Sequence, residues 1–211
     1  MKDGIKRFLS RMNRGIVLAV VLLIGMSIYF VIDARAFDRE RDAIEEMIEG
    51  FIVQANRINA LILDLPYEEV RDEIDAFIEE FFIEYRAGYH GRHFRTARQS
   101  AESGLQTLSQ MPEDMRTDEV ELSLARITSM QKQATNAVRV RFYIDAEINS
   151  EAGLIFFNGF SVTRYHFGTP GTTNVRINQE TVDALLIRSG GQWRFAEVWH
   201  MGGMTTVITV G

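Results

Sequence analysis

The segment Val138-Arg139-Val140-Arg141-Phe142-Tyr143-Ile144-Asp145-Ala146-Glu147-Ile148 decides the fold, because apolar residues alternate with charged or polar ones along its whole length. Successive side chains of a β-strand point to opposite faces, so one face of this segment is wholly apolar and the other is largely charged. That pattern is typical of an antiparallel sheet with one face covered and the other in water. We therefore expect a central, half-buried strand here.

Further strand patterns on both sides of this segment extend the sheet. Residues 120–125 alternate in the same way. Residues 182–188 and 192–199 flank Ser189-Gly190-Gly191, which predicts a hairpin with a short glycine loop. A run of antiparallel strands that follows a helical region is typical of an α+β domain, and we expect the sheet to be curved.

Two more segments have strand patterns. Residues 154–167 read as a strand that is bulged at Gly159. Residues 204–210 are almost entirely β-branched and carry no charge, which predicts a last strand. That strand either pairs within the domain's own sheet or lies exposed and pairs with another subunit, and the second reading makes Val207 and Ile208 candidates for interaction.

Two helical patterns precede the sheet. Pro66 suits the first turn of a helix, and the segment after it has a broad apolar face as far as about Arg86. In the second pattern, apolar residues recur at helical spacing from Phe94 to Leu108, and the pattern stops before Pro112. We expect both helices to pack on the apolar face of the sheet.

A longer helical pattern, over residues 37–62, has apolar residues at alternating steps of four and three. They are Ile44, Ile48, Phe51, Ala55, Ile58 and Ile62. This spacing is that of a coiled-coil seam, and it predicts an amphipathic helical stalk over residues 35–63. Two readings are open: the stripe packs on the chain's own domain, or it pairs with another chain. The second reading makes four of these residues candidates for interaction: Ile44, Ile48, Phe51 and Ile58.

Between Arg14 and Asp33 the chain has 18 consecutive uncharged residues, close to the roughly 20 that cross a bilayer as a helix. We expect one transmembrane helix, over residues 15–34. The tail of residues 1–14 has five basic residues and one acid, which favours a cytoplasmic tail and a periplasmic or extracellular domain. The alternative is a cleaved signal peptide, because Ala34-Arg35-Ala36 fits a cleavage site.

The charge outside the tail narrows the choice of partners. There are 18 basic and 28 acidic residues in that part, a poor surface for nucleic acid. The basic segment at residues 86–98 either balances the acidic helices before it or binds a partner, and the second reading singles out Arg92 and Arg95. Cysteine is absent and the four histidines lack a metal-binding spacing, so we expect no disulfide, no metal and no other cofactor.

Three segments together resemble the nuclear transport factor 2-like superfamily, a cone-shaped α+β fold also found in SnoaL-type cyclases. They are the helix Ala76-Phe77-Ile78-Glu79-Glu80-Phe81-Phe82-Ile83-Glu84-Tyr85-Arg86-Ala87-Gly88, the strand over residues 138–148, and the ending Gly190-Gly191-Gln192-Trp193-Arg194-Phe195-Ala196-Glu197-Val198. The resemblance covers about residues 67–199. It implies a ligand site between the sheet and the helices. The polar residues that could face this site are Tyr85, Tyr89, Tyr165, His166, Asp183 and His200.

The sequence thus predicts a cytoplasmic tail (1–14), a transmembrane helix (15–34), a helical stalk (35–63) and a nuclear transport factor 2-like domain (64–211). It shows no convergent acid and base pair, no phosphate loop and no nucleophile elbow, so we single out no catalytic residue. We expect a non-catalytic module in the inner or plasma membrane that binds another envelope protein or itself. The alternative is a tethered cone domain that binds a small molecule or converts one, as cyclases and isomerases do.

Overall fold

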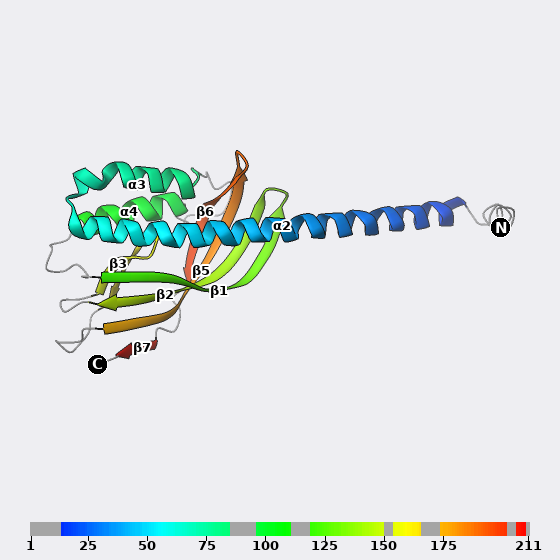
Figure 1. Ribbon diagram of the computed structural model, residues 1–211. Helices are drawn as coiled ribbons and strands as arrows, with labels where there is room; N and C mark the ends of the chain where they lie inside the picture. The colour runs from blue at the N-terminus through cyan, green and yellow to red at the C-terminus, as the bar shows by residue number, and fades with distance from the viewer. Residues whose placement is uncertain are drawn as a thin grey trace. The chain divides into compact units, whose positions relative to one another are not determined.

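The computed structural model describes residues 14–84, 96–110, 119–149, 154–165, 174–201 and 206–209 (Figure 1). Contacts within the chain divide it into two units, Met1–Asp42 and Ala43–Gly211. In the second unit, helices come first and a curved antiparallel sheet follows, which confirms the predicted α+β class. Its helices are the second half of α2 (Arg14–Asp64), α3 (Tyr67–Phe81) and α4 (Ala97–Ser109), and they lie on one side of the sheet.

The described residues of the first unit belong to the first half of α2. Large apolar side chains are exposed along it; Leu23, for example, is 64% exposed and Tyr29 is 66% exposed. The hydroxyl of Ser27 donates to the carbonyl oxygen of Leu23 at 2.8 Å, so this polar group is satisfied within the helix. In the described part of the chain, α2 is the one helix that is long and apolar enough to cross a membrane.

Among the described residues the main sheet has five antiparallel strands, in the order β1-β2-β5-β6 with β7 also paired to β5. The strands are β1 (Glu119–Ala134), β2 (Ala137–Asn149), β5 (Asn174–Ser189), β6 (Gln192–Met201) and β7 (Thr206–Thr209). The register shifts between Ile144 and Ala146 of β2, and again between Leu185 and Leu186 of β5. Such bulges bend strands and increase their twist, which accounts for the curvature of the sheet.

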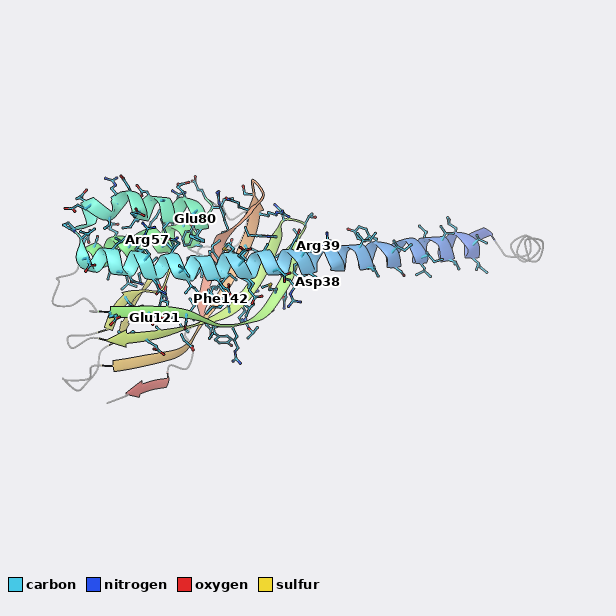
Figure 2. All side chains as sticks on the ribbon, in the orientation of Figure 1. Asp38, Arg39, Arg57, Glu80, Glu121 and Phe142 are labelled. Carbon is cyan, nitrogen blue, oxygen red and sulfur yellow. The ribbon has the colours of Figure 1, made fainter. Side chains whose placement is uncertain are left out.

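The central strand β2 has the two faces that its alternation predicts. Val138, Val140 and Phe142 are fully buried, whereas Arg139 is exposed. Phe142 lies on the side of the sheet that faces α2 (Figure 2). The sheet therefore has an inner face that packs on the helices and an outer face that carries the charged residues.

The predicted hairpin is confirmed as the connection between β5 and β6. Gly190 and Gly191 have φ angles of 61° and 88°, in the left-handed region that glycine adopts at little cost and that tight hairpin turns require. The last strand β7 pairs with β5, where Val207 lies opposite Ile177 and Ile208 lies opposite Arg176. The backbone of β7 therefore belongs to the domain's own sheet, which is the first of the two readings of this segment.

The expectation for residues 154–167 is corrected in one respect, because the middle of the segment is a turn rather than a bulge. β3 (Leu154–Phe157) and β4 (Val162–Tyr165) pair with each other in a separate two-stranded sheet. Between them, the side-chain oxygen of Asn158 accepts two backbone N–H groups of the turn, at 2.8 and 3.0 Å. Gly159, with a φ of 95°, lets the chain reverse direction here.

The heptad stripe of α2 packs on the chain's own domain. Its six apolar residues, Ile44, Ile48, Phe51, Ala55, Ile58 and Ile62, are between 0% and 2% exposed. The second unit accordingly begins at Ala43, inside the segment predicted as a stalk, and not at residue 64. Since the fold buries Ile44, Ile48, Phe51 and Ile58, these residues form part of the core and offer no free surface to a partner.

Two asparagines on the same side of α2 bind the edges of both sheets. Asn56 donates to the carbonyl oxygen of Leu122 at 2.8 Å and accepts the N–H of the same residue at 2.7 Å. Asn59 makes the equivalent pair of bonds with Phe157, at 2.8 and 3.0 Å. Leu122 lies in the edge strand β1 and Phe157 in β3, so each amide takes the place of a neighbouring strand.

Phe51 is the centre of the aromatic core. Five phenylalanine rings from other elements surround it, with centroids 4.8–5.9 Å from its own: Phe77, Phe81, Phe82, Phe160 and Phe195. Aromatic pairs at these separations stabilise by about 0.5–1.5 kcal/mol beyond the burial of their area. The helix α2 is thereby joined to α3, to the turn between β3 and β4, and to β6.

Replacement of Phe51 by alanine should lower the free energy of unfolding by about 3–5 kcal/mol, because it leaves a cavity among rigid rings. Val53→Ala, two residues along the same helix at a position 64% exposed, should change it by less than about 0.5 kcal/mol. Urea unfolding of the detergent-solubilised chain, followed by tryptophan fluorescence, measures both values. Similar small effects of the two substitutions would contradict a core role for Phe51.

Candidate functional site

The space between the sheet and the helices, where the resemblance implies a ligand site, is occupied by phenylalanine rings. The rings of Phe142 and Phe160 lie 6.3 and 4.9 Å from that of Phe195, and Phe51 lies 4.8 Å from both Phe160 and Phe195. Each of these four side chains is at most 2% exposed. The described part of the interior is therefore packed like a protein core.

The turn between β3 and β4 closes this interior, and two glycines allow its close approach. A Cβ atom on Gly159 would lie 2.3 Å from Cζ of Phe51, so no other residue fits there without displacing the ring. On α4, a Cβ atom on Gly104 would lie 3.1 Å from the Cα atom of Ser161. The turn is thus held directly against both α2 and α4.

Glu180 is a buried carboxylate on the inner face of the sheet. Glu180 of β5 lies opposite Ile144, whose side chain is buried on the inner face, and Glu180 itself is 7% exposed. It accepts a hydrogen bond of 3.1 Å from the side-chain amide of Asn158. This bond ties the β3–β4 turn to the main sheet.

A second carboxylate, Asp183, lies on the opposite face of β5. The register places it between Arg141 of β2 and Trp199 of β6, and its side chain is 1% exposed. Arg139 donates to both of its oxygens at 2.7 Å, and Arg141 donates to one of them at 2.8 Å. A buried carboxylate held by two half-exposed arginines is a strong, charge-assisted contact between two neighbouring strands.

Burial on its own would raise the pKa of Asp183, because a low-dielectric environment disfavours the charged carboxylate. The hydrogen bonds and positive charges of Arg139 and Arg141 act in the opposite direction and prevail, so the pKa of Asp183 is lower than its ordinary value. The same contact raises the pKa of Arg139, because the hydrogen bond to Asp183 favours the charged guanidinium. Asp183 and Arg139 are therefore both charged at neutral pH.

The outer face around Asp183 is rich in arginine and aromatic side chains. The guanidinium carbon of Arg139 lies 4.9 Å from the ring centroid of Trp199, and Arg126 lies at the same distance from Tyr143. Leu185, which lies opposite Arg139, and Ile187 on the same strand are half-buried. We use "outer face" for the surface made by Arg126, Arg139, Arg141, Tyr143, Leu185, Ile187 and Trp199.

A groove lies on the helical side of the domain, between two helices and the β5–β6 hairpin. Its volume is about 480 Å³. Its lining comes from α2 (Ala43, Glu46, Met47, Gly50), α3 (Glu80, Phe81) and the hairpin (Gly191, Gln192, Trp193). We call it the helix–hairpin groove. It combines an apolar floor with two carboxylates.

Of the six residues predicted to face a pocket, the structure describes three, and they lie on three different strands. Asp183 belongs to the outer face and binds arginines there, because its neighbours Val182 and Ala184 take the inner positions. His200 lies in β6 opposite Val182, and Tyr165 lies at the end of β4 opposite Leu154. The other predicted residues lie outside the described residues: Tyr85, Tyr89 and His166 of the pocket set, and Arg92 and Arg95 of the interaction set. Among the described residues, no cluster of three potential metal ligands occurs.

Sequence reasoning missed four polar residues that hold the domain together: Asn56, Asn59, Asn158 and Glu180. Asn56 and Asn59 each follow an apolar stripe residue directly, so they lie beside the buried side of the helix. An asparagine at the margin of an apolar stripe is a signal that could have indicated such a contact, because a side-chain amide needs a hydrogen-bond partner when it is buried. For Asn158 and Glu180, 22 residues apart, the sequence gives no comparable signal.

No protein-family model matches the chain, and no curated protein matches it. Among solved structures, a proposed scytalone dehydratase from Novosphingobium aromaticivorans is 15% identical, covers 82% of this chain and 89% of its own, and has a TM-score of 0.42. A hexachlorocyclohexane dehydrochlorinase (LinA) type 2 is 11% identical, with coverages of 81% and 89% and a TM-score of 0.44. A nuclear transport factor 2-like superfamily protein from Salmonella enterica is 14% identical, with coverages of 69% and 89% and a TM-score of 0.34. Likeness at this level assigns no activity to this chain.

The contact between Asp183 and its arginines predicts how stability depends on pH. Because the folded pKa of Asp183 is lowered, its contribution is fully present above the unfolded pKa of about 3.9 and is lost as the pH falls through the folded value. Asp183→Asn should lower the free energy of unfolding at pH 7 by about 1–3 kcal/mol. The difference from the wild type should shrink below about pH 4.

Urea unfolding at pH 7 and at several acidic pH values measures this difference. Asp75→Asn is the matched control, because Asp75 is exposed on α3 and the same charge is removed. The control should stay within about 0.5 kcal/mol of the wild type at pH 7. A loss for Asp183→Asn that is the same at every pH would rule out the proposed ionic origin.

Proposed function

We propose that this chain is a membrane-anchored, extracytoplasmic interaction module that is not catalytic and that presents its outer face to another envelope protein or to a second copy of itself. The observation that carries the proposal is the filled interior. The space that would hold a ligand in a cone-shaped fold is taken up by the rings around Phe51. With the described interior packed in this way, recognition falls to the outer surfaces.

The composition of the outer face supports a role in binding protein. Tyrosine, tryptophan and arginine are enriched among the residues that contribute most to protein interfaces. Here Trp199 and Tyr143 are each covered by an arginine, and the half-buried Leu185 and Ile187 lie beside them. Asp183 fixes Arg139 and Arg141 in place, which reduces the conformational entropy that these long side chains would lose on binding.

The proposed anchor is the first half of α2. Most of its apolar side chains between Ile16 and Ile32 are exposed, a costly arrangement in water but a favourable one in lipid. The basic tail before it supports a cytoplasmic N-terminus and a periplasmic or extracellular domain, at the inner or plasma membrane. A domain that is anchored in this way can hold a partner protein at the membrane through a binding surface alone.

The anchor predicts how the chain fractionates. After alkaline carbonate extraction the wild type should stay in the membrane pellet at its full mass. Leu22→Arg combined with Leu23→Arg should move most of it to the supernatant, because each arginine at the centre of a span costs about 2.5–3.5 kcal/mol. A matched pair of arginines at Val53 and Leu65, exposed positions in the second unit, should leave it in the pellet. A soluble wild-type chain that lacks residues 1–36 would contradict the anchor and indicate cleavage.

A second candidate function is ligand binding or catalysis, which one observation favours. Glu180 is a buried carboxylate on the inner face of β5. Val182, two residues further along β5, lies opposite His200 of β6. A buried carboxylate is one of the groups that act as a general base in proton transfer. Glu180→Gln distinguishes the two roles, because it keeps the bond from Asn158 but removes a general base. Under our main proposal it should leave partner capture unchanged.

To test whether the outer face binds a partner, one of its apolar residues is replaced by a charged residue. Leu185→Glu and Ile187→Glu should each reduce cross-linked complexes of the chain in native membranes by at least about tenfold, since a buried unpaired charge costs several kcal/mol at an interface. Val53→Glu is the control, because Val53 is exposed on α2, away from the sheet. Cross-linking followed by mass determination separates a homo-oligomer from a complex with another protein.

The proposal fails if the wild-type chain yields only monomer under gentle solubilisation and cross-linking. It also fails if Val53→Glu reduces the complexes as much as Leu185→Glu does. Thermal unfolding of each purified variant shows whether a loss of complexes reflects a loss of folding. A glutamate at position 185 lies opposite Arg139 of β2 but also opposite the acid Glu197 of β6, whereas one at position 187 lies opposite Ala137 and Arg194, so Ile187→Glu is the variant expected to keep the fold.

A further inference from the structure

The helix–hairpin groove is a surface distinct from the outer face. It lies on the helical side of the sheet, and its floor is apolar: Phe81 is 4% exposed, Trp193 is 6% exposed and Met47 is half-buried. Above Gly50 the groove is open, because a Cβ atom added there would meet no atom within 4 Å. A single large side chain would fill a substantial part of the roughly 480 Å³ available.

The charged residues among those that line the groove are both acidic. Glu46 and Glu80 line it, and Glu80 projects from α3 in Figure 2. Residues 43–84, which form these helices, contain 12 acidic residues and 2 arginines, and all 12 acids are exposed. Such a surface repels anionic lipid and nucleic acid and attracts basic groups.

Two arginines of the hairpin lie next to the groove without lining it. Arg188 donates to the carbonyl oxygen of Gly191 at 3.3 Å, and Arg194 donates to the side chain of Gln192 at 3.0 Å. Both acceptors are neutral groups of lining residues, so the two arginines keep their charge beside the hairpin end of the groove, while the described charged residues of the lining itself are Glu46 and Glu80. Of the two arginines in residues 43–84, Arg57 is paired with Glu73 at 2.9 Å.

We propose that the helix–hairpin groove binds a basic segment of a partner protein, which inserts one large apolar side chain against Phe81 and Trp193 and places lysine or arginine beside Glu46 and Glu80. The apolar floor provides burial, and the carboxylates select the charge of the neighbouring residues. A purely apolar ligand would leave both carboxylates without a positively charged partner from the ligand. A purely basic one would leave the floor open to water.

Fluorescence anisotropy with labelled synthetic peptides tests the proposal directly. The probe is a short lysine-rich peptide with one central tryptophan, and two matched peptides replace the tryptophan by serine or the lysines by glutamates. The full chain is held in nanodiscs of phosphatidylcholine, because a zwitterionic lipid does not itself retain basic peptides. The first peptide should bind at least tenfold more tightly than either of the others, and its affinity should fall as salt rises.

Two sets of variants locate the site. Gly50→Phe should fill the groove and weaken binding at least tenfold, whereas Gly50→Ala, which leaves the groove open, should not. Glu46→Gln with Glu80→Gln should weaken binding about fivefold to tenfold at low salt. The control removes the same charge from the same two helices at residues outside the groove, Glu45→Gln with Glu69→Gln, and should have less than a twofold effect.

Several outcomes would overturn the proposal. Equal binding of the serine and tryptophan peptides would show attraction to charge alone, and full binding by Gly50→Phe would place the peptide elsewhere. Failure of every peptide to bind at millimolar concentration would also reject it. Leu185→Glu should bind the peptide like the wild type, so the result is independent of whether the outer face binds a partner. Tryptophan fluorescence and thermal unfolding verify that each variant is folded.

Discussion

The contact of Phe51 with the turn at Gly159 is the constraint on which the rest of the domain depends. Its ring is the point where α2, α3, β6 and the β3–β4 turn meet, and the turn can come that close only because Gly159 has no side chain. One residue of a long helix thereby fixes the distance between the helical layer and two separate sheets. For this reason the second half of α2 is part of the fold, although by sequence it reads as a stalk.

The apolar contact supplies energy, and two asparagines supply alignment. Aromatic packing tolerates small shifts along a helix, whereas a side-chain amide that bonds both polar groups of one backbone residue does not. Asn56 does this at Leu122 and Asn59 at Phe157, one residue in each sheet. The strand edges that would otherwise invite pairing with another chain are thereby engaged at these points by the chain's own helix.

Local patterns in the sequence predict local structure well here, and they fail where the outcome depends on residues far apart. The alternation in β2 and the glycines of the β5–β6 turn determine their own conformation, so strand and hairpin could be predicted. The stripe through Phe51 has the same spacing whether it packs on a partner or on its own sheet, so its burial within the domain could not be predicted. The resemblance places Asp183 among the pocket residues, whereas its alternation with Val182 places it on the outer face. Only the register with β2 shows that Arg139 and Arg141 neutralise it.

Because phenylalanine rings fill the described interior of this domain, its outer surfaces are the parts left to contact other molecules. The outer face has arginines over aromatic rings, with Asp183 as its buried anchor, while the helices on the other side are strongly acidic. Surfaces of such different charge suit different partners, in line with the two binding roles proposed above, and the sheet between them keeps the two apart. A rigid aromatic core suits this arrangement, because it holds each surface in one shape whether or not the other is occupied. A ligand cavity in the same place would couple the two faces through whatever bound there.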